Sequence, residues 1–177
     1  MGLYQTAPQR STAVNAVSTV IQSILVWGLA LVILPMCLLA LEQSLGVTSL
    51  RFQPQRVAGF VMFIISAAVN TSAAFAFVRV GKGTPLPTSC PRSLVIAGPY
   101  RHVRNPMALG GIGQGLSVGV FLGSWSVLVY SLLGAVFWHV AVRPSEERDL
   151  ATRFGSDYAL YRQRVRLWLP RWRPYGG

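Results

Sequence analysis

The sequence has few acidic residues and few charges of any kind. Of its 177 residues, 5 are Asp or Glu and 16 are Lys or Arg, and charged residues make up 12% of the chain, about half the ~25% of an ordinary soluble domain. Apolar residues make up 52%. A small soluble domain cannot remove that much apolar surface from water. These proportions exclude a small soluble enzyme and a disordered chain, and they leave a membrane protein.

Cysteine is also scarce. Cys37 and Cys90 are the two in the chain, and no C-x-x-C spacing occurs. Two cysteines cannot form the disulfide framework of a small secreted domain, and the spacing offers no metal site.

Three long stretches contain no charged residue: 14–41, 57–78 and 108–142. A transmembrane helix needs about 20 mostly apolar residues. The first stretch is too long for a signal peptide and lacks an A-x-A-like end. The third is too long for one span, and Gly123 and Ser124 near its middle predict a turn. We therefore expect an all-α, polytopic membrane protein with four transmembrane helices.

The basic residues test this arrangement. With four spans and both termini on one side, that side receives every Lys and Arg except Arg51 and Arg56. The positive-inside rule then predicts that both termini are cytoplasmic, in a bacterial-type cytoplasmic membrane. Attraction to anionic headgroups of the lipid bilayer accounts for most of this charge. A nucleic-acid partner is not expected, because such binders concentrate Lys and Arg on one face of a soluble fold.

The cytoplasmic segment 83–107 contains five prolines, which exclude a continuous helix. Its apolar residues require burial, so it is not a solvated linker. Backbone amides that are fixed by prolines and lie beside arginines suit an anionic small molecule. The alternative is an interfacial or re-entrant loop whose arginines extend to the membrane surface.

The last cytoplasmic segment begins at Arg143. Ser145, followed by Glu146 and Glu147, predicts a helix start. Apolar residues then recur at spacings of three and four, as on one helix face: Leu150, Phe154, Tyr158, Tyr161 and Val165. An amphipathic helix on the membrane surface is the simple interpretation. Two carboxylates at the end of a membrane helix are costly unless partnered, so we predict that they bind a ligand. His139, two helical turns before Glu146, is a minor candidate.

Small residues recur at every fourth position from Gly111 to Gly123. This spacing predicts close packing of the third span against its hairpin partner. Ser66 and Asn70 on the second span are expected to hydrogen-bond between helices. The alternative is that neighbouring residues leave room or a polar contact for a ligand: Gly110, Gly113 and Gln114.

Four motifs follow one another in a fixed order: GPYRHVRNPM, EERDL, FGSDYALYRQRV and PRWRP. In this order and spacing the chain resembles the isoprenylcysteine carboxyl methyltransferase family. The related phospholipid N-methyltransferases share the same C-terminal half. The resemblance covers about half the chain, from residue 83 to 174. It implies two N-terminal transmembrane helices in 1–82 and a methyltransferase core in 83–177, made of the loop, the helical hairpin and the C-terminal helix.

The family pattern is matched residue by residue, with two departures. Asn105 stands where the pattern has His, and Ala108 where it has Tyr. Asn cannot titrate, which argues against proton transfer at this position, and the smaller Ala enlarges the pocket. The matching residues are Gly98, Tyr100, Arg104, Pro106, Glu146, Glu147, Leu150, Phe154, Gly155, Tyr158, Tyr161 and Val165.

The resemblance implies that S-adenosylmethionine is the cofactor and S-adenosylhomocysteine the product. The cofactor pocket would lie between the cytoplasmic loop and the C-terminal amphipathic helix. The implied cofactor-binding residues are Ser93, Leu94, Val95, Gly98, Tyr100, Asn105, Pro106, Met107, Ala108 and Glu146. The implied catalytic residues are Arg104, Arg143, Glu146 and Glu147.

The resemblance further implies methyl transfer to a lipid-like or prenylated acceptor such as a prenylcysteine-like carboxylate. Such an acceptor is already ionised, so it needs alignment in a dry site more than a base. A phospholipid or small amine is the alternative acceptor. An amine needs a base, for which Glu147 or His139 would serve. A third possibility is a non-catalytic membrane scaffold that keeps this fold.

Overall fold

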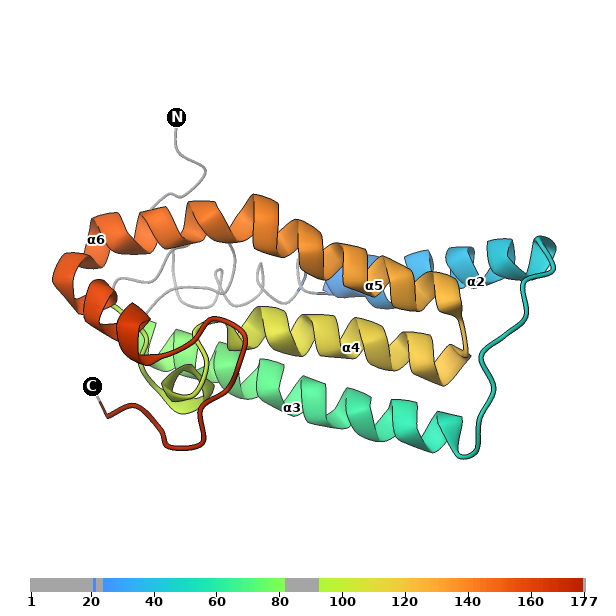
Figure 1. Ribbon diagram of the computed structural model, residues 1–177, viewed down its shortest axis with the longest axis horizontal. Helices are drawn as coiled ribbons and strands as arrows, with labels where there is room; N and C mark the ends of the chain where they lie inside the picture. The colour runs from blue at the N-terminus through green and yellow to red at the C-terminus, as the bar shows by residue number, and fades with distance from the viewer. Residues whose placement is uncertain (1–20, 22–23, 82–92, 177) are drawn as a thin grey trace.

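The computed structural model describes residue 21 and residues 24–81 and 93–176, all helix, turn and loop without strands (Figure 1). The start of the first predicted span and the proline-rich residues 82–92 lie outside the described residues. The elements in chain order are η1 (Leu29–Ile33), α2 (Leu34–Ser44), α3 (Gln55–Gly81), η2 (Gly98–Arg101), α4 (Pro106–Leu122), α5 (Trp125–Phe137), η3 (Trp138–Val142) and α6 (Arg143–Arg164).

Three described helices are long and apolar enough to cross a membrane: Ile24–Ser44, Gln55–Gly81 and Trp125–Arg164. Helix α4 is also apolar, but its 17 residues extend about 25 Å, short of the ~30 Å hydrocarbon core. The count of four spans therefore stays a prediction. Large apolar side chains are exposed along these helices, for example Ile65 and Leu133, as expected of surfaces that face lipid.

The first helix does not end at Leu41 but continues through Glu42 to Ser44. Glu42 is 3% exposed, and its carboxylate faces the start of α5. It accepts hydrogen bonds from Ser124 Oγ at 2.5 Å, the Trp125 amide at 3.3 Å and the Ser126 amide at 3.0 Å. A carboxylate at a helix N-terminus satisfies free amides and complements the helix dipole. Glu42 thus ties the first helix to the start of α5, a role the sequence analysis missed.

The turn predicted at Gly123 and Ser124 is confirmed. Gly123 ends α4 with φ +68°, a left-handed conformation that glycine adopts without strain. Ser124 begins α5, and its hydroxyl accepts a hydrogen bond from the Val127 amide at 3.2 Å. The two helices therefore form a tight hairpin.

The small residues of α4 pack as predicted against the hairpin partner at two positions. A Cβ at Gly115 would lie 2.8 Å from Ser131 Oγ, and one at Gly119 would lie 2.8 Å from a Leu128 methyl carbon. A Cβ at Gly111 would instead meet the Trp27 ring at 2.7 Å. At this position α4 therefore contacts the first helix and not its hairpin partner.

The alternative that Gly110 and Gly113 leave room for a ligand is wrong, because side chains and backbone of α3 fill the space beside these glycines. A Cβ at Gly110 would lie 2.9 Å from Asn70 Cβ, and one at Gly113 would collide with the Ser66 hydroxyl. Asn70 Nδ2 donates a hydrogen bond to Gln114 Oε1 at 3.3 Å. The prediction that Asn70 bonds between helices is confirmed.

The predicted helix start at Ser145 is wrong. Helix α5 continues through the π-turn η3 into α6, and Ser145 Oγ donates to the Val142 carbonyl at 2.7 Å instead of capping a new helix. The straight part of this combined helix, from Trp125 to Phe154, extends about 45 Å. Its apolar part ends at Val142, so α6 continues beyond the hydrocarbon core. At Gly155, φ +47° and ψ −120° interrupt the helix, and the remaining turns fold back toward η2 (Figure 1).

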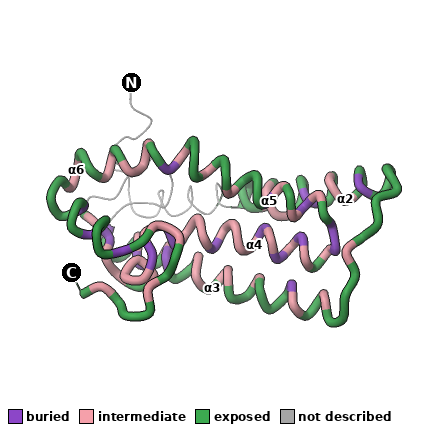
Figure 2. Tube along the Cα trace, viewed as in Figure 1, coloured by how far each residue is buried: buried purple, intermediate pink, exposed green. Residues whose placement is uncertain are grey.

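The two ends of the elongated bundle differ. The connections 45–54 and 123–124 lie at one end, and η2, α6 and the C-terminal residues gather at the other (Figure 1). Buried residues follow α4 and gather where η2 meets the end of α6 (Figure 2). The core that positions the candidate site is therefore at the end rich in arginine.

Candidate functional site

The described part of the loop packs along the end of α3. Ser93 Oγ donates to the Val80 carbonyl at 2.5 Å, and the Tyr100 ring centroid lies 6.5 Å from that of Phe77. A Cβ at Gly98 would lie 3.5 Å from Ala76 Cβ. Ala76 is five residues before the end of α3 at Gly81, which is about 7.5 Å along the helix axis. The loop therefore lies beside the last turns of this apolar helix and not beyond its end.

The loop meets α6 through a cluster of buried charges. Arg104 Nη1 lies 2.5 Å from Glu147 Oε1, and Arg143 Nη2 lies 2.6 Å from the same oxygen. Arg143 Nη1 pairs with Glu146 Oε2 at 3.1 Å, and Arg162 Nε lies 3.6 Å from Glu147 Oε2. The side chains of Arg104 and Arg143 are 10% and 6% exposed. The four predicted catalytic residues are therefore brought together. The acidic pair is partnered by arginines of the chain itself, and the prediction that it binds a ligand stays a prediction.

Tyr158 and Tyr161 complete this cluster. The Tyr158 hydroxyl accepts hydrogen bonds from Arg104 at 3.2 Å and from Arg143 at 3.5 Å. The Tyr161 hydroxyl donates to the Tyr100 carbonyl at 2.6 Å. The predicted position of both tyrosines on an apolar helix face is confirmed by the buried cluster they form with Val165. The hydrogen bonds of their hydroxyls were not predicted from the sequence.

The C-terminal residues run beside the loop. The Arg104 amide and Nε donate to the carbonyls of Arg166 and Val165 at 3.0 and 2.8 Å. The Arg171 amide donates to the His102 carbonyl at 2.9 Å. These bonds fix the loop from both the backbone and the side chain of Arg104. Two of these three bonds join backbone groups, so no pattern of residue types in the sequence predicts them.

Two buried donors, one on Arg143 of the cluster and one on the residue after Arg104, have no hydrogen-bond partner among the described residues: Arg143 Nε and Asn105 Nδ2. Asn105 is 7% exposed and Arg143 5%. Asn105 also makes no side-chain cap for α4. Leaving a buried donor unpaired costs about 1–3 kcal/mol, so unpaired donors are rare in folded proteins. Two of them, on or next in sequence to members of one cluster, fit a ligand that carries acceptor oxygens.

Tyr100 lies in the same electrostatic environment. Burial, and then the carboxylate of Glu146, raise the pKa of Tyr100 above its ordinary value of 10.0. A phenol of ordinary pKa is already protonated at physiological pH, and the raised pKa keeps this donor in alkaline solution as well.

The other predicted cofactor residues lie near the cluster in different surroundings. Val95 is buried, and Leu94 packs against Tyr158, Tyr161 and Val165. Ser93 is exposed apart from its bond to α3. The remaining three form the first turn of α4, directly after Asn105: Pro106, Met107 and Ala108.

His139 is not part of the cluster. It is exposed, and its Nδ1 accepts a hydrogen bond from Trp168 Nε1 at 3.2 Å. Trp168 belongs to the C-terminal residues and not to the cluster. Between His139 and Glu146 the helix passes through the π-turn η3, so the two side chains do not lie on one face as they would on a regular α-helix.

One cavity lies beside the loop and another lies along α6. One, of about 540 Å³, lies between α3, η2, the start of α4 and the C-terminal residues, and Gly98 is its one member of the predicted cofactor set. The other, of about 360 Å³, lies beside the interruption of α6 and is lined in part by Tyr158 and Arg162. Glu146 lines neither of these two cavities.

Comparison with known proteins supplies a family. A family model described as "phospholipid methyltransferase" matches residues 54–157, which is more than half of the chain. The matched range runs from the start of α3 into α6 and includes Arg104, Arg143, Glu146 and Glu147. A search of curated proteins found no match. The match confirms the resemblance to integral membrane methyltransferases. Among them, it indicates the phospholipid methyltransferases. The chain therefore belongs to the phospholipid methyltransferase family.

Proposed function

We propose that the protein uses S-adenosylmethionine to methylate a hydrophobic acceptor in the membrane. One observation carries this proposal: two buried donors, Asn105 Nδ2 and Arg143 Nε, have no partner among the described residues. Arg143 belongs to the ion cluster that joins the loop to α6, and Asn105 directly follows its member Arg104. The family is one of methyltransferases, and the match covers both segments that form the cluster.

The chemistry of these residues fits the cofactor. S-adenosylmethionine carries a carboxylate, an ammonium group and an adenine, and when bound it supplies a methyl group attached to a positively charged sulfur. Asn105 Nδ2 and Arg143 Nε can donate to the carboxylate. Glu146 Oε2 pairs with Arg143 at 3.1 Å, and its other oxygen can accept from the ammonium group. The ring of Tyr100 and the apolar residue Leu94 offer a wall for the adenine.

Glu147 and Tyr158 hold this site together. Glu147 neutralises Arg104 and Arg143 at once, and the Tyr158 hydroxyl accepts from both arginines. These contacts fix the guanidinium groups, so that the donors left over on Arg104 and Arg143 keep a defined direction. The arginines can then orient the acceptor, which is the alignment that methyl transfer requires.

The acceptor reaches the site from the bilayer. The loop lies beside the last turns of α3 and not beyond the end of that helix. The site is therefore at the depth of the lipids that surround these turns. Transfer to a prenylcysteine-like carboxylate forms a carbon–oxygen bond as the carbon–sulfur bond breaks, with the electron pair left on sulfur, and it moves no proton. A phospholipid amine is the second candidate, favoured by the family description, and it must lose a proton to a base.

Calorimetry in detergent with S-adenosylhomocysteine tests the cofactor. We expect saturable binding by the wild type and a loss of at least about tenfold in Glu146→Ala, since one ion-pair partner is removed. Asp157→Ala is the matched control, because Asp157 is an exposed acid on the same helix, and it should bind like the wild type. Absence of wild-type binding would overturn the proposal.

A further inference from the structure

The residues that follow α6 are held in place by the loop, and we call residues 165–176 the C-terminal segment. The amides of Arg171 and Tyr175 donate to the carbonyls of His102 and Arg101, each at 2.9 Å. Arg101 Nε donates to the Tyr175 carbonyl at 2.7 Å, and His102 Nδ1 lies 2.8 Å from the Arg171 carbonyl oxygen. The C-terminal segment has no helix of its own, yet these bonds fix its backbone.

Trp172 lies within this fixed stretch and touches almost nothing. It is 98% exposed, although Arg171 before it and Tyr175 after it are both bonded to the loop. An aromatic side chain buries about 150–250 Å² when it is covered, and Leu169 on the same segment is exposed as well. Because the hydrophobic effect favours covering such surface, the fixed backbone presents Trp172 to something outside the chain.

The surroundings of Trp172 are strongly cationic. No acidic residue follows Asp157 in the sequence. Three arginines of this region are exposed, and their side chains make no ion pair with any described residue: Arg164, Arg166 and Arg173. Uncompensated guanidinium groups attract anions, so a partner that covers Trp172 must carry negative charge.

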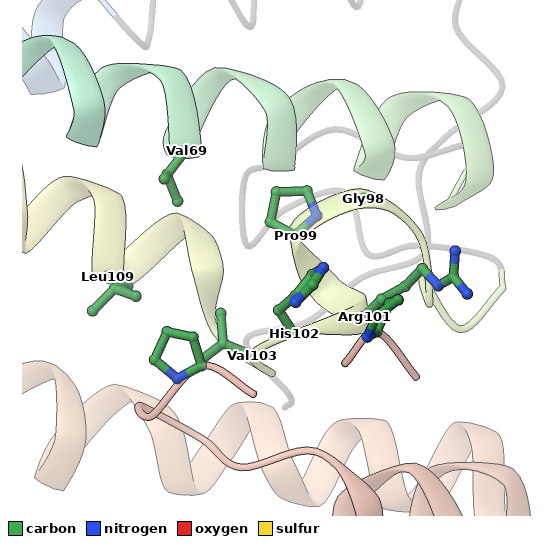
Figure 3. A pocket seen from close by; sticks show the side chains of 9 residues that line it. Val69, Gly98, Pro99, Arg101, His102, Val103 and Leu109 are labelled. Atoms are coloured by element: carbon green, nitrogen blue, oxygen red, sulfur yellow. The ribbon is translucent and has the colours of Figure 1, made fainter. Parts of the chain in front are cut away.

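The C-terminal segment lies beside the membrane-spanning helices. Its Pro170 and Pro174 line the cavity of about 540 Å³ together with Val69 and Leu109. Figure 3 shows Val69 on α3 and Leu109 on α4 at this cavity. Val69 is near the middle of α3, which is long and apolar enough to span a bilayer. The segment therefore reaches the depth of the lipids around the bundle, and Trp172, exposed between the two prolines, faces outward.

We propose that the C-terminal segment anchors this end of the bundle in the headgroup layer of the surrounding bilayer. Trp172 is inserted among the lipids, and Arg166 and Arg173 bind anionic headgroups. Tryptophan favours the membrane interface because its ring is apolar and its N–H is polar. Arginine side chains extend to the headgroups from backbone nearby, and anionic lipids attract them. These lipids belong to the bulk membrane and are not methyl acceptors, so the proposal does not depend on the proposed function.

The anchor is connected to the charged cluster. The carbonyls of Val165 and Arg166 accept hydrogen bonds from Arg104 at 2.8 and 3.0 Å, and Arg104 pairs with Glu147. The same segment is bonded to the two loop residues before Val103. Contact of the C-terminal segment with the membrane therefore holds Arg104 and the loop at a defined depth.

Fluorescence in lipid nanodiscs tests the insertion. The nanodiscs contain phosphatidylcholine with a minor fraction of phosphatidylglycerol. The emission of the wild type minus that of Trp172→Phe isolates Trp172, and the variant should fold normally because this side chain touches almost nothing. We expect the isolated emission to lie at a shorter wavelength than that of tryptophan in water and to resist quenching by acrylamide in the aqueous phase. It should lose most of its intensity when the acyl chains are brominated near the headgroup.

The anionic contact is tested with bromine on one lipid at a time. Brominated phosphatidylglycerol should quench Trp172 more than the same fraction of brominated phosphatidylcholine, because the arginines enrich anionic lipid around it. The double variant Arg166→Gln/Arg173→Gln should lose this excess. The control Arg51→Gln/Arg56→Gln removes two exposed arginines at the other end of the bundle and should keep it. Each variant is compared with its own Trp172→Phe form.

Three results would overturn the proposal. In the first, Trp172 emits as in water, and acrylamide quenches it while brominated lipids do not. In the second, neither acrylamide nor brominated lipids quench it, since a second copy of the chain or another protein then covers Trp172. In the third, the two brominated lipids quench equally, or the excess survives in Arg166→Gln/Arg173→Gln, so that the arginines hold no anionic headgroup. None of these measurements requires the cofactor, so they are independent of the calorimetry.

Discussion

The guanidinium of Arg104 lies 2.5 Å from the carboxylate of Glu147, although 43 residues separate them along the chain. Arg143 approaches the same carboxylate oxygen at 2.6 Å. One carboxylate thus compensates two buried cations from different segments. The contact joins the loop after α3 to the beginning of α6, and every proposal for the cofactor depends on that junction.

Replacing Glu147 by Gln should destabilise the protein strongly. The change leaves Arg104 and Arg143 buried without their shared anion, and removing one partner of a buried pair costs about 3–5 kcal/mol. Thermal unfolding in detergent measures this as a large fall in Tm. Asp157→Asn removes an exposed acid of the same helix and should leave Tm nearly unchanged. Equal Tm values for the two variants would show that the cluster is not a stabilising junction.

Replacing Gly110 by Ala should separate α3 from α4. The added Cβ would lie 2.9 Å from Asn70 Cβ and 3.0 Å from the Ser66 carbonyl oxygen, and overpacking of this kind costs about 1–3 kcal/mol. Gly134→Ala is the control, because a Cβ there meets nothing within 4 Å. The expected result is a lower Tm for Gly110→Ala alone. An unchanged Tm would mean that the two helices do not pack this closely.

Replacing Glu42 by Gln should loosen the far end of the bundle. The amide keeps one acceptor oxygen but loses the charge that complements the N-terminus of α5, a loss of about 1 kcal/mol. Tm should fall, and binding of S-adenosylhomocysteine should not change, because the site lies at the opposite end. Gln43→Ala, at an exposed neighbour, provides the comparison. A loss of cofactor affinity in Glu42→Gln would contradict this separation of roles.

Replacing Tyr158 by Phe tests positioning of the arginines. The ring stays in the cluster with Tyr161 and Val165, but the hydroxyl that accepts from Arg104 and Arg143 is gone. Stability should fall by about 1 kcal/mol, and affinity for S-adenosylhomocysteine should fall several-fold. Tyr130→Phe removes a hydroxyl of α5 that bonds to Ala30 at 3.4 Å, outside the cluster. That control should lose no affinity, and equal affinities in the two variants would refute a positioning role.

The features predicted correctly from the sequence are those set by local chemistry. Gly123 and Ser124 end one helix and begin the next because of their own conformational and capping preferences. The cost of unpaired carboxylates at the end of a membrane helix led us to predict a ligand for the acidic pair. Arg143 and Arg104 pair with these carboxylates in the structure, and the ligand stays a prediction.

The features that were missed or wrong depend on segments far apart in the chain. Glu42 is a single charge after an apolar stretch, and nothing near it indicates that it caps α5. Ser145 has the residues of a helix start, but the helix before it does not end, so no free amides remain to be capped. Gly110 could border a ligand or a helix, and only the position of α3 decides between them.

Transfer of a labelled methyl group tests the central claim most directly. The purified protein in lipid nanodiscs receives S-adenosylmethionine with a deuterated methyl group and a lipid extract, and mass spectrometry follows the lipids. The account predicts that one lipid class gains the mass of a labelled methyl group with the wild type and with Asp157→Ala, but not with Glu146→Ala. Labelling that is equal with Glu146→Ala, or no labelled lipid from wild-type protein that binds S-adenosylhomocysteine, would contradict it.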